Sequence, residues 1–161
     1  YEISRSDWSS DVWLFRSLVK LHPKKEVVPY LVAQLIGAFA ASLTLAQLFP
    51  DNELLGSSLP QGLEIQSFIL EFILTFMLMI VILLTSQGGK LEQYFAPVAI
   101  GATVGLEALY AGPVSNASMN PFRSLAPAVV SGHTEHLWLY LVATTLGAIV
   151  AAFYWTWQRT E

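Results

Sequence analysis

The sequence contains no cysteine and few charged side chains. Without cysteine the chain can form no disulfide, no thiolate metal site and no thiol nucleophile. Only 12% of its 161 residues are charged, roughly half the fraction of an average soluble domain, whereas 54% are hydrophobic. This balance disfavours a water-soluble enzyme, and we expect no catalytic residues and no cofactor.

Positive charge is scarce as well. Eight Lys and Arg residues stand against twelve Asp and Glu, so the net charge of -4 offers no basic surface for a nucleic-acid backbone. Three scattered histidines leave little to bind a metal ion. The sequence therefore predicts neither a nucleic-acid partner nor a metal site.

Long apolar runs are what the sequence does contain. A helix that spans a membrane needs about 20 mostly apolar residues. Glu71 alone interrupts the second such run and Glu107 the third, which is short and ends at Gly112-Pro113 because proline cannot extend a helix. The four predicted spans cover residues 27–48, 65–85, 95–112 and 137–157.

The distribution of basic residues predicts the orientation of these spans. Every Lys and Arg except Arg123 lies before the first span, between the second and third, or after the fourth. Basic residues in short loops mark the cytoplasmic side, so segments 50–64 and 131–136, which have none, are expected to face outward. Segment 112–136 must then begin and end on the outer side, and it cannot cross the membrane completely.

Segment 113–130 reads as a re-entrant loop followed by a half-helix. Asn120 is a favourable N-cap, and Pro121 suits the first helical position, where its missing N–H costs nothing. A helix of about ten residues is too short to span a bilayer. We expect an extended segment that enters the membrane, turns at Asn120 and returns to the outer surface as a helix.

In that arrangement the half-helix points the positive end of its dipole at the middle of the membrane. Arg123, in its first turn, adds a full charge that is costly there unless it faces water or partners. Asn120 and the carbonyls of residues 116–119 offer hydrogen bonds to a neutral molecule, whereas cations and protons meet repulsion. The competing interpretation is that Asn-Pro marks an ordinary surface turn.

Residues 111–128, AGPVSNASMNPFRSLAPA, resemble the second Asn-Pro-Ala loop of the aquaporin and glycerol-facilitator channels, the major intrinsic protein family. Segments 32–38, 68–76 and 100–104 resemble the third, fourth and fifth membrane helices of that family. The resemblance implies an all-α, multi-span helical bundle over residues 27–158, built from two inverted repeats that each contribute a half-helix. It also implies a homotetramer embedded in lipid, in the plasma membrane or, in a bacterium, the inner membrane.

The first of those repeats is incomplete in this sequence. Ungapped alignment places Ser9-Ser10-Asp11 where the first Asn-Pro-Ala would lie, and the first two spans are missing. We therefore expect a partial sequence or a truncated relative. Segment 1–26 is either an amphipathic segment on the cytoplasmic side or a remnant of the first half-helix.

The resemblance also implies roles for individual residues. Asn120, Pro121 and Phe122 would form the pore motif, and Arg123 would belong to the selectivity filter, with Ala108 and Ala117 at two further filter positions. Two alanines suggest a constriction wide enough for water and small uncharged solutes such as glycerol. Phe122 stands where the family usually has alanine, and Asn116 where it usually has glycine.

Three functions remain open from the sequence. The first is passive passage of water and small uncharged solutes. The second is a non-conducting half-channel that acts only as an assembly partner, and the third is a proton-coupled transporter that uses Glu71. The resemblance instead implies that Glu71 supports the backbone of the re-entrant loop by accepting hydrogen bonds.

Overall fold

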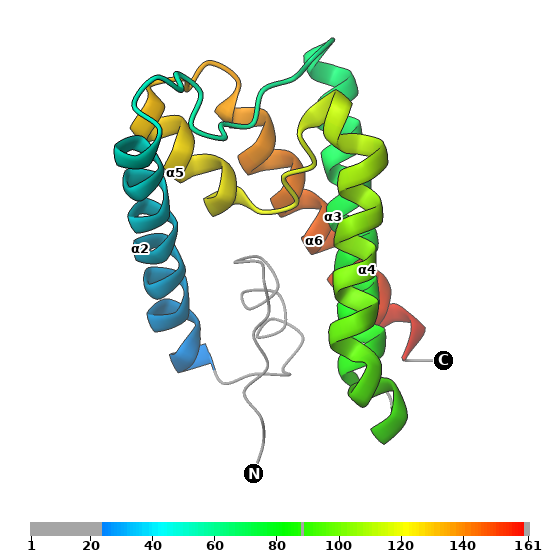
Figure 1. The fold of residues 1–161 in the computed structure, drawn as a ribbon. Helices are drawn as coiled ribbons and strands as arrows, with labels where there is room; N and C mark the ends of the chain where they lie inside the picture. The colour runs from blue at the N-terminus through cyan, green and yellow to red at the C-terminus, as the bar shows by residue number, and fades with distance from the viewer. Residues whose placement is uncertain (1–23, 88, 160–161) are drawn as a thin grey trace.

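The computed structural model describes residues 24–87 and 89–159, and within them all regular secondary structure is helical. Four helices are long and apolar enough to cross a membrane, which confirms the predicted multi-span all-α fold. The expectation for segment 1–26 falls almost entirely outside the described residues. The helices are α2 (Lys24–Leu48), α3 (Glu64–Gln87), α4 (Lys90–Ser115), α5 (Pro121–Ser131) and α6 (Leu137–Gln158) (Figure 1).

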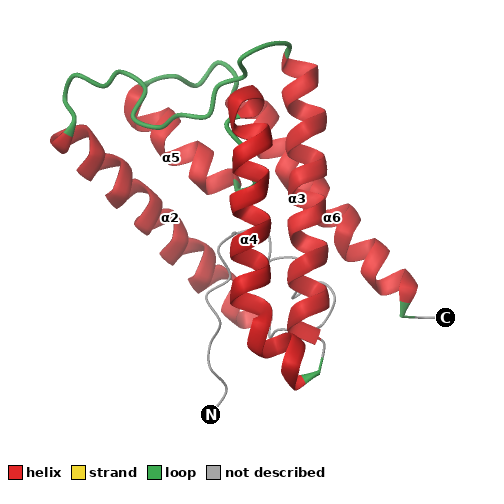
Figure 2. Cartoon of the chain, turned by 45° about the vertical axis from the view of Figure 1, so that its right-hand side comes forward, coloured by secondary structure: helices red, strands yellow, loops and turns green. Residues whose placement is uncertain are grey.

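Helices α3, α4 and α6 form the packed part of the bundle, with α3 against both of the others. Figure 2 shows α3 and α4 side by side along most of their length. The core lies where the apolar surface of α3 meets its neighbours, and Leu74, Met79, Ile82 and Leu83 are almost fully buried there. Interdigitated apolar side chains of this kind hold the three helices together.

Small residues bring α3 and α6 into close contact. A Cβ atom added at Gly147 would lie 2.5 Å from the Phe72 carbonyl oxygen. Ala143 and Ala151, four residues to either side, are fully buried. Small residues at this spacing let helix backbones approach closely inside a membrane, and here the contact is made within one chain.

Helix α4 continues beyond the end predicted for the third span. It runs through Pro113 to Ser115, and Asn116 closes it in a left-handed conformation with φ of 66°. The Asn116 N–H donates to the Gly112 carbonyl at 3.0 Å. Proline removes one helical hydrogen bond, a loss that the helix tolerates here because it ends within the same turn.

Helix α5 is the short element of the bundle. It begins part way along the height of α2 and α4 and rises toward the end of the molecule where residues 49–63 run (Figure 1). It packs against α2 on one side and α6 on the other. The predicted half-helix is confirmed, and its N-terminus lies inside the bundle rather than at an end.

Candidate functional site

The segment that leads into α5 has an unusual backbone. Asn116, Ala117 and Met119 have φ angles of 66°, 43° and 52°, in the left-handed region that residues other than glycine rarely adopt. Asparagine tolerates this region better than most residues, which explains how Asn116 can adopt it. A segment held in strained conformations needs support from its surroundings.

Glu71 of α3 supplies that support. Its carboxylate oxygen Oε1 accepts hydrogen bonds from the Ser118 amide at 2.8 Å and the Ser115 hydroxyl at 2.7 Å, and Oε2 accepts one from the Met119 amide at 2.9 Å. Glu71 is 0% exposed. Buried carboxylates and buried amides are both costly unless paired, and here each satisfies the other. Both oxygens are engaged in holding the loop.

Asn120 forms the N-cap of α5, as predicted. Its side-chain Oδ1 accepts from the backbone N–H groups of Phe122 at 2.9 Å and Arg123 at 3.3 Å. Pro121 is the first residue of the helix. The cap satisfies two of the N–H groups that a helix leaves without intrahelical partners, and it fixes where the positive end of the dipole lies.

Arg123 is held by the loop formed by residues 49–63. Its Nη1 donates to the Gly56 carbonyl at 3.0 Å and to the Ser58 hydroxyl at 2.6 Å. The sequence did not predict this contribution, because serine and glycine in a short polar loop carry no recognisable motif. Gly56 has a φ of 79°, a conformation that glycine adopts without strain.

Three of the predicted site residues line one hollow between α2 and α5. Asn120, Phe122 and Arg123 face it from α5 and its cap, and Arg123 remains exposed despite its two hydrogen bonds. The hollow has a volume of about 680 Å³. Its remaining lining comes from α2, residues 55–56 and the middle of α5: Gln34, Gly37, Ala38, Ala41, Ser42, Leu45, Leu55, Gly56 and Pro127.

The other two predicted filter residues lie elsewhere. Ala117 is buried in the strained segment, and Ala108 lies on the exposed face of α4. Ala108 follows Gly101 and Gly105 at helical spacing, and Cβ atoms added at either glycine would meet nothing within 4 Å. The described residues thus bring Asn120, Phe122 and Arg123 together and leave Ala108 and Ala117 outside their hollow.

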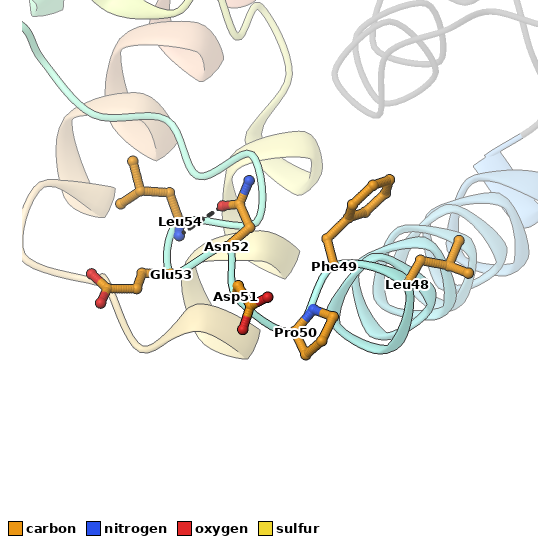
Figure 3. A pocket seen from close by; sticks show the side chains of 7 residues that line it. All are labelled: Leu48, Phe49, Pro50, Asp51, Asn52, Glu53 and Leu54. Carbon is orange, nitrogen blue, oxygen red and sulfur yellow. Dashed lines mark hydrogen bonds between the residues drawn. The ribbon is translucent and has the colours of Figure 1, made fainter.

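A second hollow of about 600 Å³ lies where α2 ends, at residues 48–54 (Figure 3). It is formed by one continuous turn, in which Asn52 Oδ1 accepts from the amides of Leu54 at 3.1 Å and Leu55 at 2.9 Å. It contains none of the predicted site residues. The Asn52 side-chain oxygen is thus occupied in shaping the loop itself.

Other polar side chains lie apart from the α5 site. Glu107 of α4 is buried, and within residues 24–87 and 89–159 its carboxylate has no hydrogen-bond partner. At one end of the bundle, His136 Nδ1 lies 2.6 Å from Glu64 Oε1. Nowhere in the described part of the chain do three metal-binding side chains gather.

Comparison with known proteins gives consistent matches. The family model described as major intrinsic protein matches residues 12–155. Nodulin-26 of Glycine max is 41% identical over 152 residues, covering 94% of this chain and 56% of that protein. Aquaporin NIP1-1 of Arabidopsis thaliana is 44% identical over 146 residues, covering 85% of this chain and 49% of that protein. The chain therefore spans about half the length of the curated relatives it matches.

A solved structure has the same fold. The X-ray structure of the aquaglyceroporin from Plasmodium falciparum superposes with a TM-score of 0.77 at 18% sequence identity, covering 93% of this chain and 71% of that one. At this identity the likeness concerns the arrangement of the helices alone.

Proposed function

Because the chain belongs to the major intrinsic protein family, we propose that it forms part of a passive channel for water and small uncharged solutes such as glycerol. It is a multi-pass membrane protein with four candidate spans. The observation that carries the proposal is the shared hollow of Asn120 and Arg123 at the N-terminal end of a half-helix inside the bundle.

Passage rests on hydrogen-bond exchange at the tip of α5. A water molecule that leaves bulk solvent loses partners, and the Asn120 amide and the Arg123 guanidinium supply donors in their place. The carbonyl groups of residues 116–119 are proposed as further acceptors along the same path. A neutral solute exchanges partners step by step, so the barrier to its passage stays low.

Cations are excluded by the same elements. The amides of the first turn of α5 and the Arg123 charge together create a fixed positive potential at the hollow. Arg123 keeps its place because the Gly56 carbonyl and the Ser58 hydroxyl accept its hydrogen bonds. Nothing in this mechanism requires a reaction, so we propose a channel rather than an enzyme.

The proposed solute class follows from small residues at the two further filter positions. We propose Ala108 and Ala117 as filter residues, together with Arg123. Ala108 shares its helical face with Gly101 and Gly105, so three successive positions on that face carry small residues. Small side chains beside one charged donor would leave room for glycerol as well as water.

The setting proposed for the protein is a plasma membrane, or the inner membrane of a bacterium, with a homotetramer as the assembled form. Large apolar side chains on the outer faces of α2 and α4 are exposed, including Ile36, Leu43, Leu106 and Leu109. Such faces suit contact with lipid or with neighbouring subunits.

A flux assay tests the proposed function. Vesicles that carry the full-length protein with this sequence are mixed with hyperosmotic sucrose or glycerol, and their volume is followed by light scattering. We expect fast shrinkage with weak temperature dependence, followed by re-swelling in glycerol. Shrinkage no faster than in protein-free vesicles would contradict the proposal and favour a non-conducting assembly partner, whereas dependence on a pH gradient would favour a coupled transporter.

The control variant for this assay lies outside the path. Val150→Ala changes an exposed apolar side chain on α6, a helix that contributes no residue to the hollow. Its flux should equal that of the unmodified protein. Arg123→Ala should retain water flux and admit more of the solutes that the positive charge excludes.

A further inference from the structure

A row of serine hydroxyls connects the loop of residues 49–63 with the segment that precedes α5. Ser124 Oγ donates to Ser58 Oγ at 2.8 Å, and Ser124 Oγ also lies 2.6 Å from Ser118 Oγ. The Ser118 amide in turn donates to Glu71. We call Ser58, Ser124 and Ser118 the serine chain. It runs continuously from the loop that holds Arg123 to the carboxylate that holds the re-entrant segment.

The geometry at Ser58 is specific. Its Oγ accepts one hydrogen bond from Arg123 Nη1 at 2.6 Å and another from Ser124. A hydroxyl oxygen has two lone pairs, and both are used here. The donation from Ser124 therefore fixes Ser58 Oγ as an acceptor directed at the guanidinium.

Burial makes this arrangement rigid. Ser58 is 4% exposed and Ser124 is 1% exposed, so water has little access to either hydroxyl. Hydrogen bonds to a charged group are shorter and stronger than those between neutral groups. Arg123 itself is exposed toward the hollow, so its position depends on the few anchors that the loop provides.

We propose that Ser58 is a positioning residue for Arg123, and that Ser124 holds Ser58 in place. The loop of residues 49–63 then sets the position of the guanidinium in the path and thereby the selectivity. This inference rests on the proposed function, because the position of Arg123 matters only where solutes pass it. The chain offers a matched control at the neighbouring residue, since Ser57 is equally buried and its Oγ lies 2.8 Å from Ser131 Oγ on α5, whereas the Arg123 guanidinium donates to Gly56 and Ser58.

The first test measures Arg123 directly and needs no flux. The full-length protein in lipid nanodiscs is treated with phenylglyoxal, and modification of each arginine is followed by peptide mass spectrometry. Arg159, whose guanidinium lies 4.6 Å from the centre of the Trp155 ring, serves as the internal reference. We expect Ser58→Ala to raise the relative rate at Arg123 by roughly threefold or more, because a hydrogen bond to a charged group is lost while Gly56 remains.

Three further variants distinguish the positioning of Arg123 by Ser58 from a general loosening of the loop of residues 49–63. Ser57→Ala removes a hydrogen bond between the same loop and α5, and it should leave the Arg123 rate unchanged. Ser58→Thr keeps the hydroxyl and should restore the original rate, and Ser124→Ala should raise it. An unchanged rate in Ser58→Ala, or an equal rise in Ser57→Ala, would overturn the proposal. If Ser58→Ala fails to fold, Ser124→Ala and Ser58→Thr decide the question.

The second test measures the selectivity between glycerol and water. In the vesicle assay we expect Ser58→Ala to change the ratio of glycerol to water permeability, whereas Ser57→Ala leaves that ratio unchanged. An unmodified protein without any flux would contradict the proposed channel, but the labelling result would still decide whether Ser58 positions Arg123. Normal flux with the same ratio in Ser58→Ala would contradict the inference and leave the channel intact.

Discussion

Glu71 Oε1 accepts a hydrogen bond from the Ser118 amide at 2.8 Å, although the two residues lie 47 positions apart in the sequence. This contact joins the first half of α3 to the segment that precedes the half-helix. Residues 116–120 belong to no helix, and three of them have positive φ angles. The carboxylate therefore replaces the regular backbone hydrogen bonds that the segment lacks.

Replacing Glu71 with Gln should destabilise the protein strongly. In this variant one of the two carboxylate oxygens becomes an NH₂ group. That NH₂ group would face one of the donors whose hydrogen bonds Glu71 accepts, and the donor would lose its partner. Leaving one buried donor unpaired costs about 1–3 kcal/mol. The melting temperature in detergent should fall clearly in Glu71→Gln and little in the control Glu92→Gln, whose side chain is exposed in the first turn of α4. Equal melting temperatures in all three proteins would contradict the supporting role.

A methyl group at Gly147 should force α3 and α6 apart. The added Cβ would lie 2.5 Å from the Phe72 carbonyl oxygen, which belongs to a helix backbone and cannot yield easily. Overpacking of this kind costs about 1–3 kcal/mol. The control Gly101→Ala meets nothing within 4 Å and should be neutral or slightly stabilising. Thermal unfolding gives the melting temperature of each variant. A Gly147→Ala variant as stable as Gly101→Ala would be inconsistent with the close contact.

Two substitutions at Asn120 separate its capping role from its place in the path. Asn120→Ala removes the cap and should cost about 1 kcal/mol. Asn120→Asp keeps an acceptor oxygen for the Phe122 and Arg123 amides, so stability should change little. The aspartate adds a negative charge at the tip of α5, and we expect it to admit cations. Thermal unfolding and cation flux in vesicles distinguish the two effects; unchanged cation exclusion in Asn120→Asp would argue against a role for residue 120 in the path.

Phe122 lines the hollow beside small residues of α2, where its ring occupies space that solutes would otherwise use. Phe122→Ala should therefore increase glycerol permeability. The variant should fold, because the ring is only partly buried. Stopped-flow uptake measures the effect, with Leu125→Ala as a matched control on α5 outside the hollow lining. Lower glycerol uptake in Phe122→Ala than in the control would mean that the ring shapes the path rather than obstructs it.

Local sequence features predict much of this fold. Apolar runs locate the four spans because a membrane-crossing helix must be long and apolar. Asn120 and Pro121 locate the start of α5 because capping depends on adjacent residues. The end of α4 was harder, since Pro113 normally stops a helix and here lies in its last turn.

Contacts between distant segments were not predictable in the same way. Nothing in the sequence of residues 49–63 indicates that Gly56 and Ser58 reach Arg123, because the contact exists only once α2 and α5 are packed together. The supporting bonds of Glu71 could be expected only from the family resemblance. Periodicity and composition describe single elements, whereas the site combines side chains from α3, α5 and two loops.

The most direct test of the re-entrant geometry uses the absence of native cysteine. Single cysteines are placed at Asp51, Lys90, Asn120 and Thr134 of the full-length protein in sealed vesicles, and a membrane-impermeant maleimide is added from one side at a time. We expect positions 51 and 134 to react from one side, position 90 from the other, and position 120 far more slowly than position 134. Labelling of 51 and 134 from opposite sides, or equally fast labelling of 120 and 134, would contradict a half-helix that enters the membrane and returns.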